Sequence, residues 1–148
     1  MPFFLEDELK HSAFSIVSNR GTKFQLKVKN LDIEKWEQQL KEGKTYIAQN
    51  FEVESNKEDY KTTKHGYKLV FVKGTMLKEQ DLLDIPHYVY DFTKFESIIN
   101  KNVVADVLIE VIGEFVDLVQ CSLETRPKKL VFTMRDEGYI LNISLSPV

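Results

Sequence analysis

The sequence predicts a mostly-β protein with one or two short helices, arranged as a small antiparallel barrel. Three observations lead to this class: segments of alternating apolar and polar residues recur, turn residues separate them, and few segments have a helical period. The chain has 148 residues, of which 43% are hydrophobic. This is enough for one domain with a real core, or for one small domain and part of another.

The first two apolar segments are expected to form a hairpin. Residues 12–17 (SAFSIV) and residues 22–29 (TKFQLKVK) flank a turn at 19–21 that contains a glycine. In the second segment, apolar residues alternate with lysine and glutamine, so one face should be buried and the other basic. Gly21 permits the positive φ that such a turn needs.

A short amphipathic helix is predicted over residues 30–43. Apolar residues recur there at helical spacing, and charged residues cover the other side. Trp36 lies on the apolar stripe and is therefore expected in the core. Asn30 is expected to cap the start of the helix, and Gly43 is expected to follow its end.

Two further strands are predicted over residues 44–55 and 67–77, with a loop between them. Ile47, Phe51 and Val53 should face the core from the first strand, and Tyr67 should lean on the core from the second. The resulting order places a helix between the third and fourth strands. This is the order of an OB-fold, a five-stranded Greek-key barrel.

The rest of the chain is less regular. Residues 78–102 read as a connector with a helical turn near 91–99. Residues 103–120 are rich in β-branched residues, and Gly113 is expected to mark a bend. A second hairpin is expected around residues 136–138.

The charge is unevenly distributed along the chain. The formal net charge is -3, yet the segment from Arg20 to Lys73 has 12 Lys/Arg against 8 Asp/Glu. The negative total argues against indiscriminate binding to nucleic acid, which needs many phosphate contacts. A local basic segment remains, either as an ordinary solvated surface or as a binding site.

Signals of other functions are missing from the sequence. Cys121 is the single cysteine, so we expect no internal disulfide and read it as a structural thiol. The three histidines lack metal-site spacing, and no catalytic or phosphate-binding motif stands out. We therefore expect no enzymatic activity, metal or cofactor. No apolar run approaches 18 residues, so no membrane partner is expected either.

Several stretches resemble one known family when they are taken in order. The stretches "FSIVSNRGTKFQLKVK", "LKEGKTYI", "DIPHYVYDFTKFESI", "VLIEVIG" and "KKLVFTMRDEGYILNISL" resemble the large subunits of replication protein A, closest to the plant-type relatives. The resemblance covers residues from about 12 to 145. It implies tandem OB-folds that bind single-stranded DNA in the nucleus during replication, repair and recombination.

The resemblance also implies a binding surface. In this family, a basic groove follows the single strand and aromatic rings stack on its bases. Tyr60, in the loop between the last two strands of the first OB-fold, matches a base-stacking aromatic. The expected nucleic-acid-binding residues are Lys23, Lys27, Lys29, Tyr60, Lys61, Lys64 and Lys68.

Departures from the family pattern support a second hypothesis. Lys29 and Ser146 stand where the family has stacking aromatics, and Gln25 stands where it has a basic residue. One stacking ring of three is kept. The alternative is therefore a degenerate OB-fold that binds a protein, or forms a homodimer, through an unfinished barrel edge, with little or no DNA binding.

The domain boundaries follow from the resemblance. Residues 1–77 are expected to form the first OB-fold with its first strand missing, residues 78–102 the connector, and residues 103–148 the N-terminal part of a second OB-fold. Three explanations of the unfinished barrels stay open. The strand near 104–112 completes the first barrel, two chains exchange strands, or the chain is a degenerate relative or an excised fragment.

Overall fold

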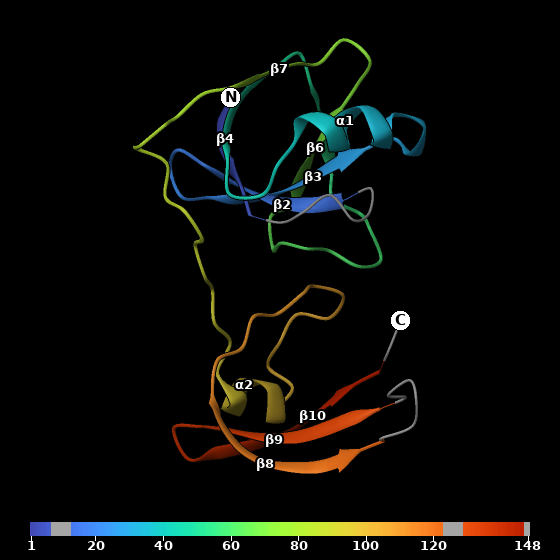
Figure 1. Cartoon of the computed structure of the whole chain (residues 1–148). Coiled ribbons are helices and arrows are strands. Elements are labelled where there is room, and N and C mark those ends of the chain that lie inside the picture. The colour runs from blue at the N-terminus through green and yellow to red at the C-terminus, as the bar shows by residue number, and fades with distance from the viewer. Residues whose placement is uncertain (7–12, 123–128, 147–148) are drawn as a thin grey trace. The chain divides into compact units, whose positions relative to one another are not determined.

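The chain folds into two compact units. The computed structural model describes residues 1–6, 13–122 and 129–146. The first unit comprises Met1–Tyr90 and Asp106–Leu108, and the second comprises Asp91–Ala105 and Ile109–Val148 (Figure 1). Within the described residues, no helix is long and apolar enough to cross a membrane.

The first unit is built on one seven-stranded sheet. Its strand order is β5-β6-β3-β2-β1-β4-β7, and every neighbouring pair is antiparallel except β3 and β6. The strands are β1 (Pro2–Leu5), β2 (Ala13–Ser18), β3 (Lys23–Val28), β4 (Thr45–Gln49), β5 (Glu52–Ser55), β6 (Tyr67–Phe71) and β7 (Met76–Glu79).

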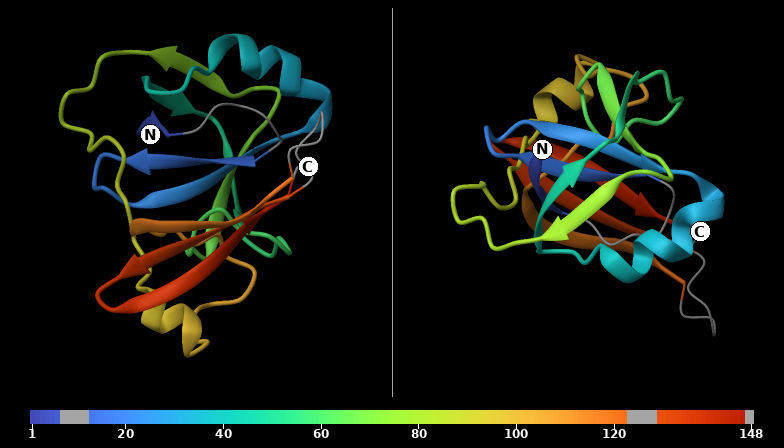
Figure 2. Two further views of the ribbon diagram at one scale, coloured as in Figure 1. Left: turned by 60° about the horizontal axis from the view of Figure 1, so that its bottom comes forward. Right: turned by 90° about the horizontal axis from the view of Figure 1, so that it is seen from above.

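A bent segment brings this sheet round on itself. Strands β4 and β5 are separated by only two residues, and Asn50 between them has a φ of 58°. The Asn50 amide also donates to the carbonyl of Gly74 at 2.9 Å. Strand β4 pairs with β1 near one end of the strand order, whereas β5 pairs with β6 at the other end. The continuous segment of β4 and β5 therefore connects the two ends of the sheet. The curved strands in Figures 1 and 2 follow this OB-fold arrangement.

The expectation that the first strand is missing is wrong. Strand β1 pairs with β2 on one side and with β4 on the other. Phe3, Phe4 and Leu5 are all buried. A strand that is covered on both faces reads as a continuous apolar run rather than an alternating one, which is why the pattern did not reveal it. The first barrel therefore has its own first strand and does not need residues 104–112 for that role.

Aromatic side chains fill the core of the first unit. Trp36 is buried as expected and meets the ring of Phe71 edge-on, with 4.9 Å between centroids. Phe3 stacks on Tyr46 at 5.6 Å. The Tyr46 hydroxyl accepts a hydrogen bond from the amide of Lys41 at 2.8 Å. Burial of this phenol raises the pKa of Tyr46 above its usual value.

The helix is shorter than the sequence pattern suggests. A 3-10 turn, η1 (Asn30–Asp32), leads into α1 (Ile33–Gln39). Asp32, rather than Asn30, is the residue before the α-helix, and its side chain makes no capping hydrogen bond. The expected N-cap at Asn30 is therefore wrong. Gly43 has a φ of 76° and lies in the turn after the helix.

The hairpin of β2 and β3 is confirmed, and Gly21 in its turn has a φ of 75°. The predicted faces of the next strands are partly wrong. Thr45, Tyr46 and Ala48 are the buried residues of β4, whereas Val53 in β5 is exposed. Tyr67 was expected in the core but is 55% exposed, because it is the first residue of β6 and projects beyond the packed layer.

The connector expected at residues 78–102 is divided between the units. Its first residues belong to β7, which pairs with β4. Residues 80–90 then cover the outer surface of the first strands, where Ile85 packs with Phe4 and Val17 in a second small apolar cluster. His87 stacks on the Phe4 ring at 4.2 Å.

The second unit contains one helix and a three-stranded antiparallel sheet of order β10-β9-β8 (Figure 2). The expected hairpin around residues 136–138 is confirmed, and Gly138 has a φ of 95°. Phe95 is buried, whereas Cys121, expected to be a structural thiol, is exposed. The elements are α2 (Phe95–Ile99), β8 (Glu114–Cys121), β9 (Leu130–Asp136) and β10 (Tyr139–Leu145).

This sheet has one apolar face and one mixed face, on which Val131 and Ile140 lie among polar residues. Pairing across the strands sets Phe115 beside Met134 and Leu118 beside Phe132 on one face, and Glu114 beside Arg135 on the other. Phe115 is 60% exposed and Leu118 is 49% exposed. The residues of this apolar face are Phe115, Leu118, Cys121, Leu130, Phe132, Met134, Leu141, Ile143 and Leu145.

Candidate functional site

Two lysines from separate strands meet on the outer face of the first unit. Strands β3 and β6 run parallel, and their register sets Gln25 beside Lys68. Lys27 is the next outward residue on β3, since side chains alternate along a strand. The long side chains of Lys27 and Lys68, called the lysine pair below, therefore converge, although they lie 41 positions apart in the sequence.

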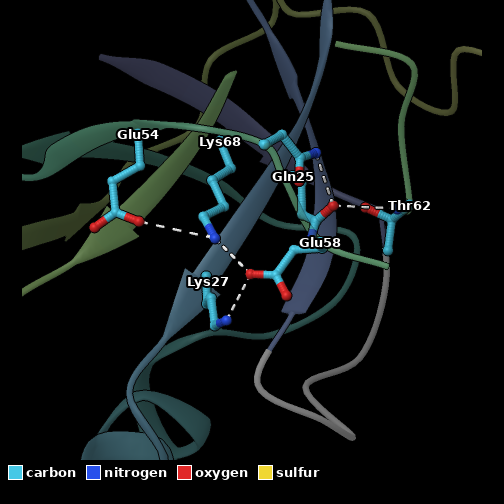
Figure 3. A network of polar contacts seen from close by, with 7 residues as sticks. Gln25, Lys27, Glu54, Glu58, Thr62 and Lys68 are labelled. Atoms are coloured by element: carbon cyan, nitrogen blue, oxygen red, sulfur yellow. Dashed lines mark hydrogen bonds and ion pairs between the residues drawn. The ribbon is translucent and has the colours of Figure 1, made fainter. Parts of the chain in front are cut away.

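One carboxylate oxygen is shared by both lysines. Oε1 of Glu58 accepts a hydrogen bond from Nζ of Lys27 at 2.6 Å and another from Nζ of Lys68. Oε2 of Glu54 lies 3.8 Å from Nζ of Lys68 on the other side. Figure 3 shows both ammonium groups directed at Glu58. Their hydrogen bonds lower the pKa of Glu58 to about 2.

A buried amide holds the loop that carries Glu58. This β5–β6 loop comprises residues 56–66. Oε1 of the buried Gln25 accepts from the Asn56 amide at 3.0 Å and from the backbone N–H of Thr62 at 3.2 Å. The Asn56 N–H donates to the carbonyl of Gly66 at 2.8 Å, which closes the base of the loop. The loop is therefore held against β3 by a glutamine in the middle of the outer face (Figure 3).

Backbone contacts also hold the loop on its far side. The N–H of Lys61 donates to the carbonyl of Asp106 at 2.7 Å, and the N–H of Leu108 donates to the carbonyl of Lys61 at 2.8 Å. These are the bonds of an isolated parallel bridge between Lys61 and Val107. The Lys61 side chain is thus carried on a fixed backbone.

The same loop contains unsatisfied polar atoms. Five buried side-chain N or O atoms lack a hydrogen-bond partner within the described ranges, and three of them are Asn56 Oδ1, Thr62 Oγ1 and Thr63 Oγ1. Buried polar atoms are normally paired, because leaving one unpaired costs free energy. Not every buried polar atom of the β5–β6 loop near Gln25 therefore has a hydrogen-bond partner.

Two tyrosines of this region are available to flat ligands. Tyr60 is 87% exposed near the middle of the loop, and Tyr67 is exposed where the loop ends. His65 lies between them in sequence and packs on Phe24, with 4.2 Å between ring centroids. Its Nδ1 accepts from the N–H of Tyr67 at 3.1 Å. The sequence pattern had placed Tyr67 in the core, so this second exposed ring was missed.

The remaining lysines proposed from the sequence differ in their surroundings. Nζ of Lys23 lies 3.4 Å from Glu6, whose other oxygen accepts from the N–H of Val89 at 3.1 Å. Lys29 and Lys64 are exposed at the end of β3 and in the loop. The structure thus brings Lys27, Lys68 and the loop together, whereas Lys23 lies in a separate contact with Glu6.

Glu58 is the residue of this candidate site that the sequence pattern did not reveal. In the sequence it appears only as a negative charge beside Lys57. Its role depends on the parallel pairing of β3 with β6, which brings the lysine pair to the same place. Among the described residues, no group of three or more His, Cys, Asp or Glu is arranged to hold a metal ion.

Comparison with protein families gives one match. A family model described as "Domain of unknown function DUF223" matches residues 6–101. The chain belongs to this family. The search of curated proteins gives no match.

Solved structures agree with the fold of this DUF223 protein. A replication protein A heterotrimer bound to ssDNA contains a chain that is 20% identical, with a TM-score of 0.55 over 91% of this chain and 32% of that chain. The protein therefore spans about a third of the length of that relative. A structure described as "Molecular basis for abrogation of activation of pro-inflammatory cytokines" is 12% identical, with a TM-score of 0.50 over 100% of this chain and 76% of that one. At these identities the likeness establishes the OB-fold.

Proposed function

We propose that this DUF223 protein, related to the large subunit of replication protein A, binds single-stranded DNA without sequence specificity and acts in DNA replication, repair or recombination. We place its action in the nucleus and assign it no enzymatic activity. The observation that carries the proposal is the position of Tyr60. This ring is 87% exposed on the β5–β6 loop of an OB-fold, directly beside Lys61 and near the lysine pair.

The chemistry of the surface suits a flexible single strand. Lysine ammonium groups neutralise phosphates, and each exposed ring can stack on a base for about 1–3 kcal/mol. Tyr60, near the middle of the loop, and Tyr67, just after its end, offer two such rings. Neither interaction reads base edges, so binding is expected to depend on salt more than on sequence.

A second candidate function rests on the second unit. Its sheet exposes an apolar face that includes Phe115 and Leu118. Within the residues described, no strand pairs with the outer edges of β8 and β10. Exposed apolar faces and open strand edges are typical of protein–protein contacts. A protein partner or a second copy of the chain would bind there.

Fluorescence anisotropy with a labelled oligo-dT of about 20–30 nucleotides, long enough for one or more OB-folds, tests the first proposal. The affinity of the wild type should fall linearly on a log–log plot against salt concentration. Tyr60→Ala should weaken binding by about fivefold to about 150-fold, since a stacked ring contributes about 1–3 kcal/mol.

The matched control is Tyr60→Phe, which keeps the ring and should bind nearly as well as the wild type. Absence of binding at about 50 mM salt, where phosphate contacts are only weakly screened, would contradict the proposal. The search would then turn to protein partners of the second unit.

A further inference from the structure

The lysine pair holds an anionic group that belongs to the protein itself. Glu58 places a single carboxylate oxygen between Nζ of Lys27 and Nζ of Lys68. Charge-assisted hydrogen bonds of this kind form equally with carboxylate and phosphate oxygens. The geometry of the site is therefore that of an oxyanion site with its ligand supplied by the protein (Figure 3).

If Glu58 moves away, neither lysine ammonium is left buried without a partner or water. The Lys68 side chain is 9% exposed, so an isolated ammonium there would be costly. Glu54 remains within 3.8 Å of Lys68 when Glu58 departs. Lys27 is more exposed and keeps access to water. A phosphate arriving from solution would restore the hydrogen bonds that Glu58 gives up.

The loop also contains buried polar atoms that a different conformation could pair. Three of its buried polar atoms, on Asn56, Thr62 and Thr63, lack partners in the closed arrangement. Glu58 is two residues from the exposed Tyr60, so a backbone movement at Glu58 would also change the position of the Tyr60 ring. Release of Glu58 is thereby coupled to the position of the ring proposed to stack on a base.

We propose that the lysine pair is a phosphate site which Glu58 occupies in the absence of ligand, and that a phosphate group of the bound strand takes the place of this carboxylate. The assignment of that phosphate to a nucleic acid rests on the proposed function. Glu58 is then a built-in competitor that lowers affinity, and its displacement couples phosphate binding to rearrangement of the β5–β6 loop.

The test compares two variants that remove one negative charge from the same loop. Glu58→Gln removes the competitor and should raise the affinity for oligo-dT by about tenfold, the effect of a lost charge-assisted contact. Asp59→Asn removes an exposed neighbouring carboxylate and should change the affinity by less than about twofold, as general electrostatics predicts. Equal gains in both variants, or a loss of affinity in Glu58→Gln, would overturn the inference.

A second arm does not depend on nucleic acid. Inorganic pyrophosphate is titrated into both variants and the wild type, and backbone amide NMR resonances of β3 and β6 are followed. Shifts around Lys27 and Lys68 should saturate at a concentration about tenfold lower in Glu58→Gln than in the wild type.

The two arms separate the inference from the proposed function. Tighter pyrophosphate binding in Glu58→Gln without any oligo-dT binding would reject the proposed function and retain the anion site. Equal pyrophosphate affinity in Glu58→Gln and the wild type would overturn the anion site, whatever the oligonucleotide does.

Discussion

Two sets of three consecutive antiparallel strands in this chain have the same local design and different surroundings. Strands β1, β2 and β3 are the central strands of the seven-stranded sheet, whereas β8, β9 and β10 form a sheet by themselves. A glycine with positive φ lies in the turn of each last hairpin, Gly21 in one and Gly138 in the other. In the first unit, β4 pairs with one edge and β6 with the other, and aromatic residues fill the interior.

The second sheet lacks such partners within the described part of the chain. Its apolar face carries exposed residues such as Phe115 and Leu118, and Phe95 is the buried apolar residue on the helix of this unit. The difference shows that alternation of residues sets the strand, whereas the elements that pair with its edges decide whether the strand is buried. Substitutions in the buried first unit should therefore lower the free energy of unfolding more than equivalent substitutions in the exposed second sheet.

The largest expected contrast comes from placing a charge in each sheet. Phe3→Asp puts a carboxylate into the buried core of the first unit and should cost at least about 4 kcal/mol of unfolding free energy. Leu118→Asp places the same group on a half-exposed face and should cost less than about 1 kcal/mol. Urea unfolding followed by the fluorescence of Trp36, the single tryptophan, measures the first; circular dichroism at β-sheet wavelengths measures the second. Similar losses in the two variants would break the comparison.

A smaller contrast is expected when a ring is removed from each unit. Phe71→Ala leaves a cavity beside Trp36 and should cost about 3–5 kcal/mol. Phe115→Ala removes the same side chain from an exposed position and should cost less than about 1 kcal/mol. The urea midpoints of the two variants, each compared with the wild type, measure these losses. A large loss in Phe115→Ala would mean that a partner covers the apolar face in solution.

The smallest effect is expected from acid. Because the lysine pair lowers the pKa of Glu58 to about 2 from an ordinary value of 4.5, Glu58 stabilises the first unit above about pH 4.5. That stabilisation is lost as the pH falls toward 2. We expect a loss of about 1 kcal/mol, since Glu58 keeps part of its surface in water and is partly screened.

The measurement is the urea midpoint of Trp36 fluorescence at several pH values. The wild type should lose more stability than Glu58→Gln across this range. Asp59→Asn, which leaves the lysine pair intact, should follow the wild type. Parallel curves for the wild type and Glu58→Gln would show that the ion pairs contribute nothing to folding.

Local patterns in the sequence were sufficient for part of the fold. The alternation in residues 22–29 and the glycine at 21 predicted the first hairpin, and helical spacing placed Trp36 in the core. Strand β1 was missed because both of its faces are buried: Phe3 and Leu5 lie in the main core, and Phe4 lies in the second apolar cluster. Pairing between distant segments cannot be read from residue alternation.

The candidate site could be predicted only in part for the same reason. The exposure of Tyr60 agrees with its expected place in a loop. Tyr67 has the parity of a core residue, but its position at the start of β6 leaves it exposed. The contact of Glu58 with Lys27 and Lys68 arises from the parallel pairing of β3 with β6, which no spacing in the sequence encodes.

The most direct test of the central claim maps the ligand on both units at once. Amide NMR spectra of the whole chain are recorded while an oligo-dT of about 8–10 nucleotides, the span of a single OB-fold, is added. We expect shifts in the first unit at the β5–β6 loop around Tyr60 and at Lys27 and Lys68, with β8, β9 and β10 unchanged. Shifts confined to the second unit, or no shifts at all, would contradict the assignment of this OB-fold surface as a single-stranded DNA site.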